Sequence, residues 1–413
     1  MGSIDLKYLL LVINLYLVVF NNSIINLGFW DELFAIVILC YSILQIIYNR
    51  FKINISVNTF IQIISIVLII IIGIGSNIQH KFQSFSPILL DVIVTLKFPI
   101  TFFGSLLLFK NYKFGNKMKQ FYFHVRIITT TIFVLALIDC IFGIYHGDIS
   151  NYGIRQIQLF YGHPTFLAAI SVLLLCLNLS FLKTNKKAIV YICMCVFTSL
   201  VTLRMKVIIF ILLFWFIYFV AIKLSKKIKI RQFLVFIPFS VYIAMDKIVF
   251  YFLNDRTDIA RTALMKTSFK IAKDFFPLGS GFATFGSYYS GQINNYSPIY
   301  DMYGISNVYG LSKHYNSFIA DSFWPMILSQ FGFLGIMLYL IFLLFIFKKI
   351  SKTYYNNQQC YYVTFLLLSY LVISSTSESA FNNSFAVSFA LYLSIFIAYG
   401  LRKCKEVNNG EKE

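Results

Sequence analysis

Three arginines, Arg155, Arg204 and Arg261, lie far apart in the sequence, and each lies in or beside a segment that connects apolar stretches. His163 follows the first of them closely, and Lys206 lies two residues after the second. A guanidinium keeps its charge and presents a planar fork of donors that matches two phosphate oxygens at once. We therefore take these five side chains as candidate ligands of a substrate diphosphate. The alternative for the second arginine and the lysine is that they extend to lipid headgroups.

Two acidic residues and a histidine near the same segments could remove a proton from a hydroxyl group. Asp321 begins an apolar stretch, His314 precedes it by seven residues, and Glu378 follows another apolar stretch. A general base must lie within hydrogen-bonding reach of its proton. We take all three as candidate catalytic residues, although a lone loop histidine is more often a surface residue. The acids do not show the spacing of a metal site, so no metal and no cofactor is expected.

The composition indicates what kind of protein must hold these residues. Of the 413 residues, 59% are hydrophobic and 12% are charged, whereas a soluble domain is about half apolar and about a quarter charged. This excludes a soluble enzyme, a disordered protein and a secreted disulfide scaffold. In a soluble protein the net charge of +19 would suggest nucleic acid, but here most basic residues flank apolar segments, so nucleic acid is not an expected partner.

Apolar segments of the length needed to cross a bilayer, about 20 residues, recur along the chain. We predict an all-α polytopic membrane protein with about twelve spans, at approximately 6–22, 31–48, 57–76, 87–109, 123–145, 164–182, 188–203, 206–222, 232–252, 322–347, 360–377 and 384–401. With both termini in the cytoplasm, the lysine clusters at 183–187, 223–231 and 348–352 share the cytoplasmic side, as the positive-inside rule requires. A single long or broken helix across Arg204 and Lys206 would instead leave eleven spans and invert the orientation of every later segment.

One long hydrophilic stretch interrupts this pattern. We interpret residues 1–413 as a single integral membrane domain and residues 253–321 as its extracytoplasmic loop. Within the loop, residues 258–276 are predicted to form a short amphipathic helix, with Asp258 as its N-cap and Pro277 just beyond its end.

Arg261 occupies an unusual position on this predicted helix. At 100° per residue it falls near the middle of the apolar face, and the lysines fall on the opposite face. A buried guanidinium is costly unless it is paired. Arg261 is therefore expected either to pair with an acid such as Asp91 or Glu378, or to bind an anionic ligand.

Two further features each allow two interpretations. Asp91 and Lys97 lie six residues apart in the fourth predicted span. Ionisable residues inside a membrane are functional candidates by default, and a structural Asp–Lys pair is the alternative. The glycine-rich segment 277–286 either makes turns or lets backbone approach a ligand.

Four segments resemble those of the O-antigen polymerase and ligase superfamily. They are RQIQLFYGHPTFLA (155–168), LRMK (203–206), RTALMKTSFKIAKDFFPLGSGFATFG (261–286) and DSFWPMILSQFGFLGIMLYL (321–340). The second carries the arginine of a short outer turn, the third contains the "PLG-G-G-F" turn, and the last resembles the start of a span in the Wzy-type capsular and exopolysaccharide polymerases. In the related ligases a histidine lies eleven positions before the first glycine of "GxxG". Here Gly332 and Gly335 match the glycines but Asp321 holds that position, which disfavours a ligase.

The resemblance implies a GT-C-like glycosyltransferase of the bacterial plasma membrane, multi-pass with both termini cytoplasmic. Such a polymerase transfers a glycan from undecaprenyl diphosphate onto a lipid-linked repeat unit at the outer face. The undecaprenyl-diphosphate-linked oligosaccharide would be its substrate, and a flippase and a chain-length regulator are candidate partners. The alternatives are a ligase that uses another acceptor, a flippase for lipid-linked oligosaccharide, and a structural subunit of an export complex. A flippase often shows inverted repeats, and none is visible here.

Overall fold

The computed structural model describes residues 5–21, 27–50, 55–145, 147, 149, 153–219, 249 and 258–410, and these residues are almost entirely helical or in turns. Within these described residues, six helices are long and apolar enough to cross a membrane. They are α2 (Trp30–Tyr48), α3 (Val57–His80), α4 (Phe85–Phe109), α5 (Lys117–Phe142), α13 (Phe323–Thr353) and α15 (Phe385–Gly410). Shorter helices accompany them: α1 (Leu6–Phe20), α6 (Pro164–Leu179), α7 (Ala188–Leu200), α8 (Met205–Ile217) and α14 (Gln358–Ser374). The protein is thus a helical membrane protein.

The predicted apolar segments correspond well to these helices. The ninth, at 232–252, lies outside the described residues except for residue 249, and each of the others contains one helix. At Arg204 the chain forms two helices that contact each other rather than one long helix, with Arg204 as the N-cap of α8. Each of these two helices has 13 residues, which is shorter than the six long helices.

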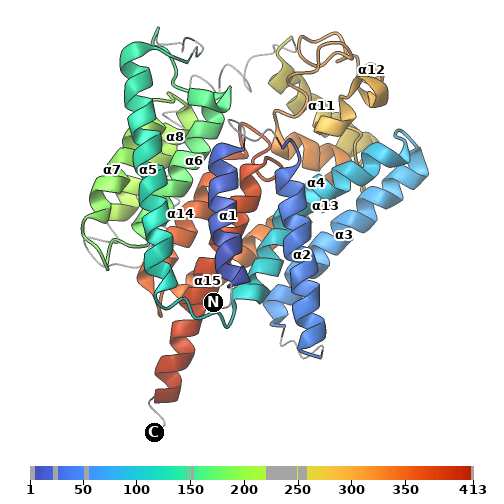
Figure 1. The fold of residues 1–413 in the computed structure, drawn as a ribbon. Helices are drawn as coiled ribbons and strands as arrows, with labels where there is room; N and C mark the ends of the chain where they lie inside the picture. Colours follow the sequence, from blue (N-terminus) through green and yellow to red (C-terminus); the bar gives the residue numbers. More distant parts are fainter. Residues whose placement is uncertain are drawn as a thin grey trace.

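Helix α15 occupies the centre of the bundle. It contacts α1, α2, α4, α6, α13 and α14. In Figure 1 α15 lies between the α2–α4 group and the α5–α8 group, while α13 lies beside α3 and α4. Helix α6 is apolar on all sides and almost wholly buried, as expected of a helix that other helices surround. Helix α3, by contrast, leaves many large apolar side chains exposed, which suits a surface in contact with lipid.

Helix α13 is broken at Gly332, where the backbone has a φ of 65° and a ψ of −166°. The carbonyl groups of Ser329 and Gln330, just before the break, accept hydrogen bonds from the N–H groups of Ser280 and Gly281 at 2.8 and 2.9 Å. The glycine-rich turn 277–286 thus supplies the donors that the interrupted helix lacks. Gly332 must be glycine, because a Cβ there would collide with the carbonyl oxygen of Pro277.

Side chains from α3 and α4 hold the other face of the same turn. The amide of Asn77 donates to the carbonyl of Phe282 and accepts from its N–H, at 3.0 and 2.7 Å. The carboxylate of Asp91 accepts from the N–H of Ala283 at 2.6 Å. The turn is therefore a structural junction of three helices. This favours the turn-making interpretation of the glycine-rich segment, and it gives Asp91 a structural contact other than the predicted pair with Lys97.

The segment from residue 258 to the start of α13 contains α11 (Ala260–Asp274), two short 3-10 turns and α12 (Ile299–Met302). It packs around a small apolar core of its own that includes Leu264, Ile271 and Tyr300. In Figure 1 this segment lies at the end of the bundle opposite the two chain ends. Arg261 of α11 is therefore held at that end of the molecule.

Two predictions about α11 are wrong. The helix begins after Ile259 without a side-chain cap, so Asp258 is not its N-cap. Its buried face centres on Leu264 and Ile271 rather than on Arg261, because those residues meet the loop's own core and α13. Arg261 lies at the edge of that face, with 30% of its side chain exposed.

Candidate functional site

Two ion pairs join segments that are far apart in the sequence. Arg261 of α11 lies 3.0 Å from the carboxylate of Asp321, just before α13. Lys206 of α8 lies 2.5 Å from the carboxylate of Glu378, in the loop between α14 and α15. Both cations belong to the predicted diphosphate ligands, and both acids belong to the predicted bases.

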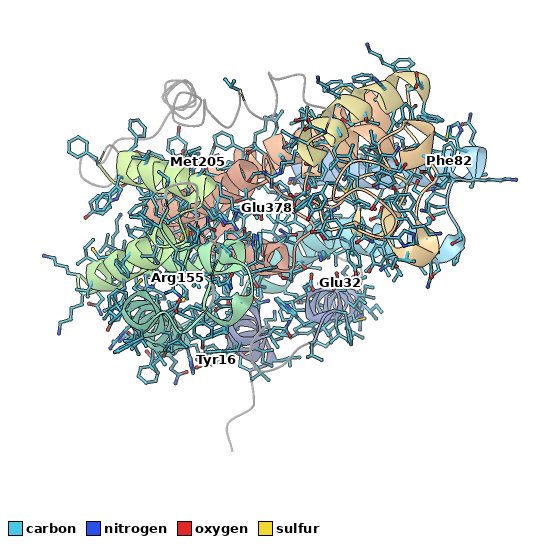
Figure 2. The ribbon with its side chains drawn as sticks, turned by 90° about the horizontal axis from the view of Figure 1, so that it is seen from above. Tyr16, Glu32, Phe82, Arg155, Met205 and Glu378 are labelled. Carbon is cyan, nitrogen blue, oxygen red and sulfur yellow. The ribbon has the colours of Figure 1, made fainter. Side chains whose placement is uncertain are left out.

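The two pairs are neighbours. The hydroxyl of Ser379 donates to the carbonyl of Ala320 at 2.8 Å, so the residues that follow Glu378 and precede Asp321 are bonded to each other. Glu378 interacts electrostatically with Lys206, Asp321 and Arg261. Figure 2 looks onto this end of the bundle and shows Glu378 close to the start of α8, which the label of Met205 marks.

Arg204 and His163 extend this group. The guanidinium of Arg204 lies 3.0 Å from Nε2 of His163, and His163 is the N-cap of α6, where its Nδ1 accepts from the N–H of Thr165. The charge of Arg204 also acts on Lys206. We use "charge cluster" below for these six residues: His163, Arg204, Lys206, Arg261, Asp321 and Glu378.

The charge cluster combines three cations with two carboxylates, so with a neutral histidine it carries excess positive charge. Its carboxylates differ in exposure: the side chain of Asp321 is 35% exposed and that of Glu378 is 12% exposed. Burial raises the pKa of Glu378, while the neighbouring Lys206 acts to lower it. The more exposed Asp321 is thus the carboxylate that a ligand reaches more easily.

Arg155 does not lie in the charge cluster. Its guanidinium donates to the carbonyl of Tyr145 at 2.5 Å and to the carbonyl of Asp139, and lies 3.4 Å from the Asp139 carboxylate. Asp139 lies in the last turn of α5, and Tyr145 lies just past the end of that helix. The structure therefore places Arg155 against the C-terminal end of α5, a position that its sequence neighbourhood did not indicate.

His314 is also apart. It is exposed in the segment between α12 and α13, and among the described residues it makes no hydrogen bond to the charge cluster. Its placement fits the surface alternative better than the catalytic one.

Lys97 and Asp91 do not pair with each other. Lys97 is almost fully buried and contacts two acids of α2, Asp31 and, at 2.8 Å, Glu32. Sequence reasoning did not consider Asp31, Glu32 or Asp139. All three are acids at the edge of, or inside, an apolar segment, which is the signal that could have singled them out.

The arrangement can bind an anion with several charges and can accept a proton nearby. Within the described ranges, no group of three or more His, Cys, Asp or Glu side chains is placed to hold a metal ion. In comparisons with known proteins, the chain matches no protein-family model and no curated protein. What the site does must therefore be argued from its own chemistry.

Proposed function

We propose that this protein is a polysaccharide polymerase of the plasma membrane. In this proposal it transfers a glycan from undecaprenyl diphosphate onto a lipid-linked repeat unit, and the charge cluster holds the diphosphate. The observation that carries the proposal is the gathering of Arg204 and Lys206, at the start of α8, with Arg261 of the distant helix α11 at one end of a helical membrane bundle. The resemblance of four segments to the O-antigen polymerase and ligase superfamily supplies the identity of the glycan carrier.

The chemistry follows from charge neutralisation. A diphosphate is a good leaving group once cations offset its charge, and fixed guanidinium groups can do this without a metal. The acceptor hydroxyl loses its proton to a carboxylate and attacks the anomeric carbon. The bond from that carbon to the diphosphate oxygen breaks, and undecaprenyl diphosphate leaves with the electron pair. A single displacement of this kind inverts the anomeric centre.

Asp321 is the base we favour. It is more exposed than Glu378, and it pairs with Arg261, one of the proposed diphosphate-binding residues. When the diphosphate binds Arg261, it competes with Asp321 for the guanidinium. A carboxylate that loses a cationic partner is a stronger base. Substrate binding would thus prepare the base at the moment it is needed.

The proposed topology has twelve spans, with residues 253–321 outside the cell and both termini in the cytoplasm. The position of α11 and α12 at the end of the bundle opposite both termini supports it (Figure 1). A cysteine-free chain carrying Asn307→Cys should react with an impermeant thiol reagent in intact cells, whereas Lys186→Cys should react only after lysis. Both positions are exposed, so the opposite labelling would reject this topology.

The function is tested with purified protein in proteoliposomes. Lipid-linked single repeat units, extracted from cells of the source organism that lack the protein, should be converted into a ladder of oligomers. The ladder should persist in excess chelator. Movement of the substrate across the bilayer without a ladder would indicate a flippase, and a ladder that requires added magnesium or manganese would reject the arginine-based mechanism.

A further inference from the structure

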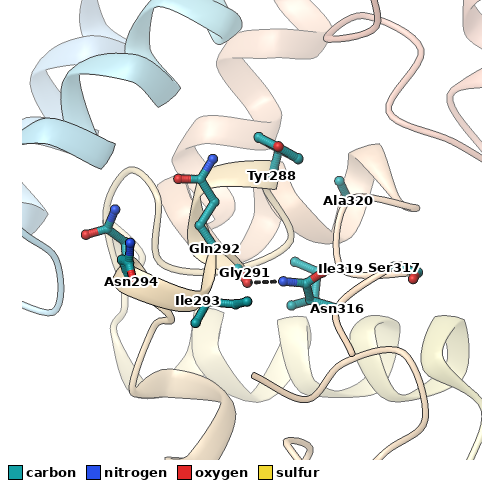
Figure 3. A pocket seen from close by; sticks show the side chains of 10 residues that line it. Tyr288, Gly291, Gln292, Ile293, Asn294, Asn316, Ser317, Ile319 and Ala320 are labelled. Atoms are coloured by element: carbon teal, nitrogen blue, oxygen red, sulfur yellow. Dashed lines mark hydrogen bonds between the residues drawn. The ribbon is translucent and has the colours of Figure 1, made fainter. Parts of the chain in front are cut away.

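A cavity of about 420 Å³ lies in the segment between α11 and α13. One wall is formed by residues 288–295 and the other by residues 316–320, and Figure 3 shows the two walls facing each other. This volume is within the range of about 300–1,000 Å³ that is usual for small-molecule sites.

The walls of this cavity are fixed to each other. The side-chain amide of Asn316 donates to the carbonyl of Gly291 at 2.5 Å (Figure 3). The side chain of Ile319 packs so closely on Gly291 that a Cβ there would lie 2.6 Å from it. The wall at 288–295 is also tied to the α3–α4 connection, because the amide of Gln83 donates to the carbonyl of Asn295 at 2.6 Å. The cavity is therefore built in advance of any ligand.

The described residues of the lining are uncharged, and they combine polar with apolar side chains. The polar ones are Gln292, Asn294, Asn295, Asn316 and Ser317, and the others include Tyr288, Ile293 and Ile319. Among the described residues, no group donates to or accepts from the side-chain amides of Gln292 and Asn294, so both remain available to a ligand. Tyr288 is 66% exposed.

This lining matches the chemistry of a neutral sugar. A side-chain amide carries a donor and an acceptor next to each other and can bind two neighbouring hydroxyl groups. An aromatic ring offers an apolar face to the C–H groups of a pyranose. No charged side chain is among the described residues of the lining, so the cavity offers a uronic acid no cation to offset its charge.

The position of the cavity connects it with the charge cluster. Its wall ends at Ala320, the residue before Asp321, and the carbonyl of Ala320 is bonded to the residue after Glu378. We propose that this cavity binds an uncharged pyranose residue of the glycan whose diphosphate lies on the charge cluster. This inference rests on the proposed function and names the sugar class that the site takes.

A glycan array tests the inference with the full-length protein in detergent. The array carries neutral glycans and glycans that contain uronic acid. The protein should bind a subset of the neutral glycans. The double variant Gln292→Ala/Asn294→Ala should bind them about tenfold more weakly or worse, because two hydrogen-bonding amides are lost. Asn307→Ala removes an exposed amide of the same segment outside the cavity and should bind like the wild type.

Three results would overturn the sugar site: equal binding by the double variant, binding confined to acidic glycans, or no binding to any glycan. The polymerisation assay separates this inference from the proposed function. If the double variant polymerises with an unchanged KM, the sugar site fails and the polymerase stands. If the array behaves as expected but the wild type makes no ladder, the polymerase fails and the sugar site stands.

Discussion

Two groups of charged residues in this membrane protein differ in how far their side chains are exposed. Lys97 lies between Asp31 and Glu32, and the side chains of Lys97 and Asp31 are at most 4% exposed. In the charge cluster, Arg261 and Asp321 are each about one-third exposed. The first group is closed to ligands, whereas the second is open to them.

This difference separates two uses of charge. A buried charge that loses its partner is strongly destabilising, so the Lys97 group acts on stability. A partly exposed pair contributes little to stability because water screens it. The exchange of a carboxylate for a phosphate, as we propose for Arg261, is therefore compatible with the folded state.

Lys97→Ala should have the largest effect on stability. It leaves two acids beside an empty space in the bundle, and we expect a loss of about 3–5 kcal/mol. The measurement is thermal or denaturant unfolding in detergent. Lys187→Ala, which removes an exposed lysine, serves as the control. If Lys97→Ala is as stable as that control, the buried group does not stabilise the fold.

Arg261→Lys should instead affect activity. The charge remains, but the bidentate fork is lost. Loss of one such contact in the transition state costs about 2–4 kcal/mol, or roughly 30- to 1,000-fold in rate. The measurement is the initial rate of ladder formation, with Lys273→Ala on the exposed face of α11 as the control. A variant that folds normally and polymerises at the wild-type rate would contradict the diphosphate role.

A double-mutant cycle measures how much the Arg261–Asp321 pair itself stabilises the fold. Arg261→Ala, Asp321→Ala and the combined variant are compared with the wild type by unfolding in detergent. For a pair of this exposure we expect a coupling of about 0.2–1 kcal/mol. A coupling as large as several kcal/mol would make the pair a structural element like the Lys97 group.

The smallest effect concerns Glu378 and pH. Burial raises the pKa of Glu378 in the folded protein, so the unfolded chain releases this proton at a lower pH than the folded chain. Between the two pKa values the folded state binds more protons, and stability therefore falls as pH rises through that window and is constant above it. Glu378→Gln should lack this slope while keeping an acceptor for Lys206. Unfolding midpoints at a series of pH values give the comparison, and parallel curves would show that Glu378 is not the group responsible.

Much of the fold could be predicted from the sequence because hydropathy and helix length are local properties. The apolar segments outside the undescribed region each contain a helix, and the separation of α7 from α8 followed from the charges at Arg204 and Lys206. The break in α13 could not be predicted, since it depends on donors that a turn some fifty residues earlier supplies. Likewise, the buried face of α11 depends on the loop core that covers it.

For the site, the residue types indicated which side chains gather, but the partner of each side chain could not be predicted. The sequence singled out eight residues, and the structure gathers six of them, while Arg155 and His314 lie elsewhere. Lys97 could not be matched with Asp91, because a spacing of six residues does not place two side chains on one helix face as three or four does. Arg261 pairs with Asp321 rather than with Asp91 or Glu378, which only the packing of α11 on α13 decides.

The junction between the turn 277–286 and the break in α13 has a consequence for how such a protein can diversify. It fixes the chain just after α11 and again near the start of α13, which holds Arg261 and Asp321 in place. Among the intervening residues 287–320, Tyr300 and Ile319 share an apolar core with α11, whereas Tyr288 and Asn294 of the cavity lining are exposed and can change without disturbing that core. If the cavity binds a sugar as proposed, selection can act on sugar preference at these exposed residues separately from the charged residues.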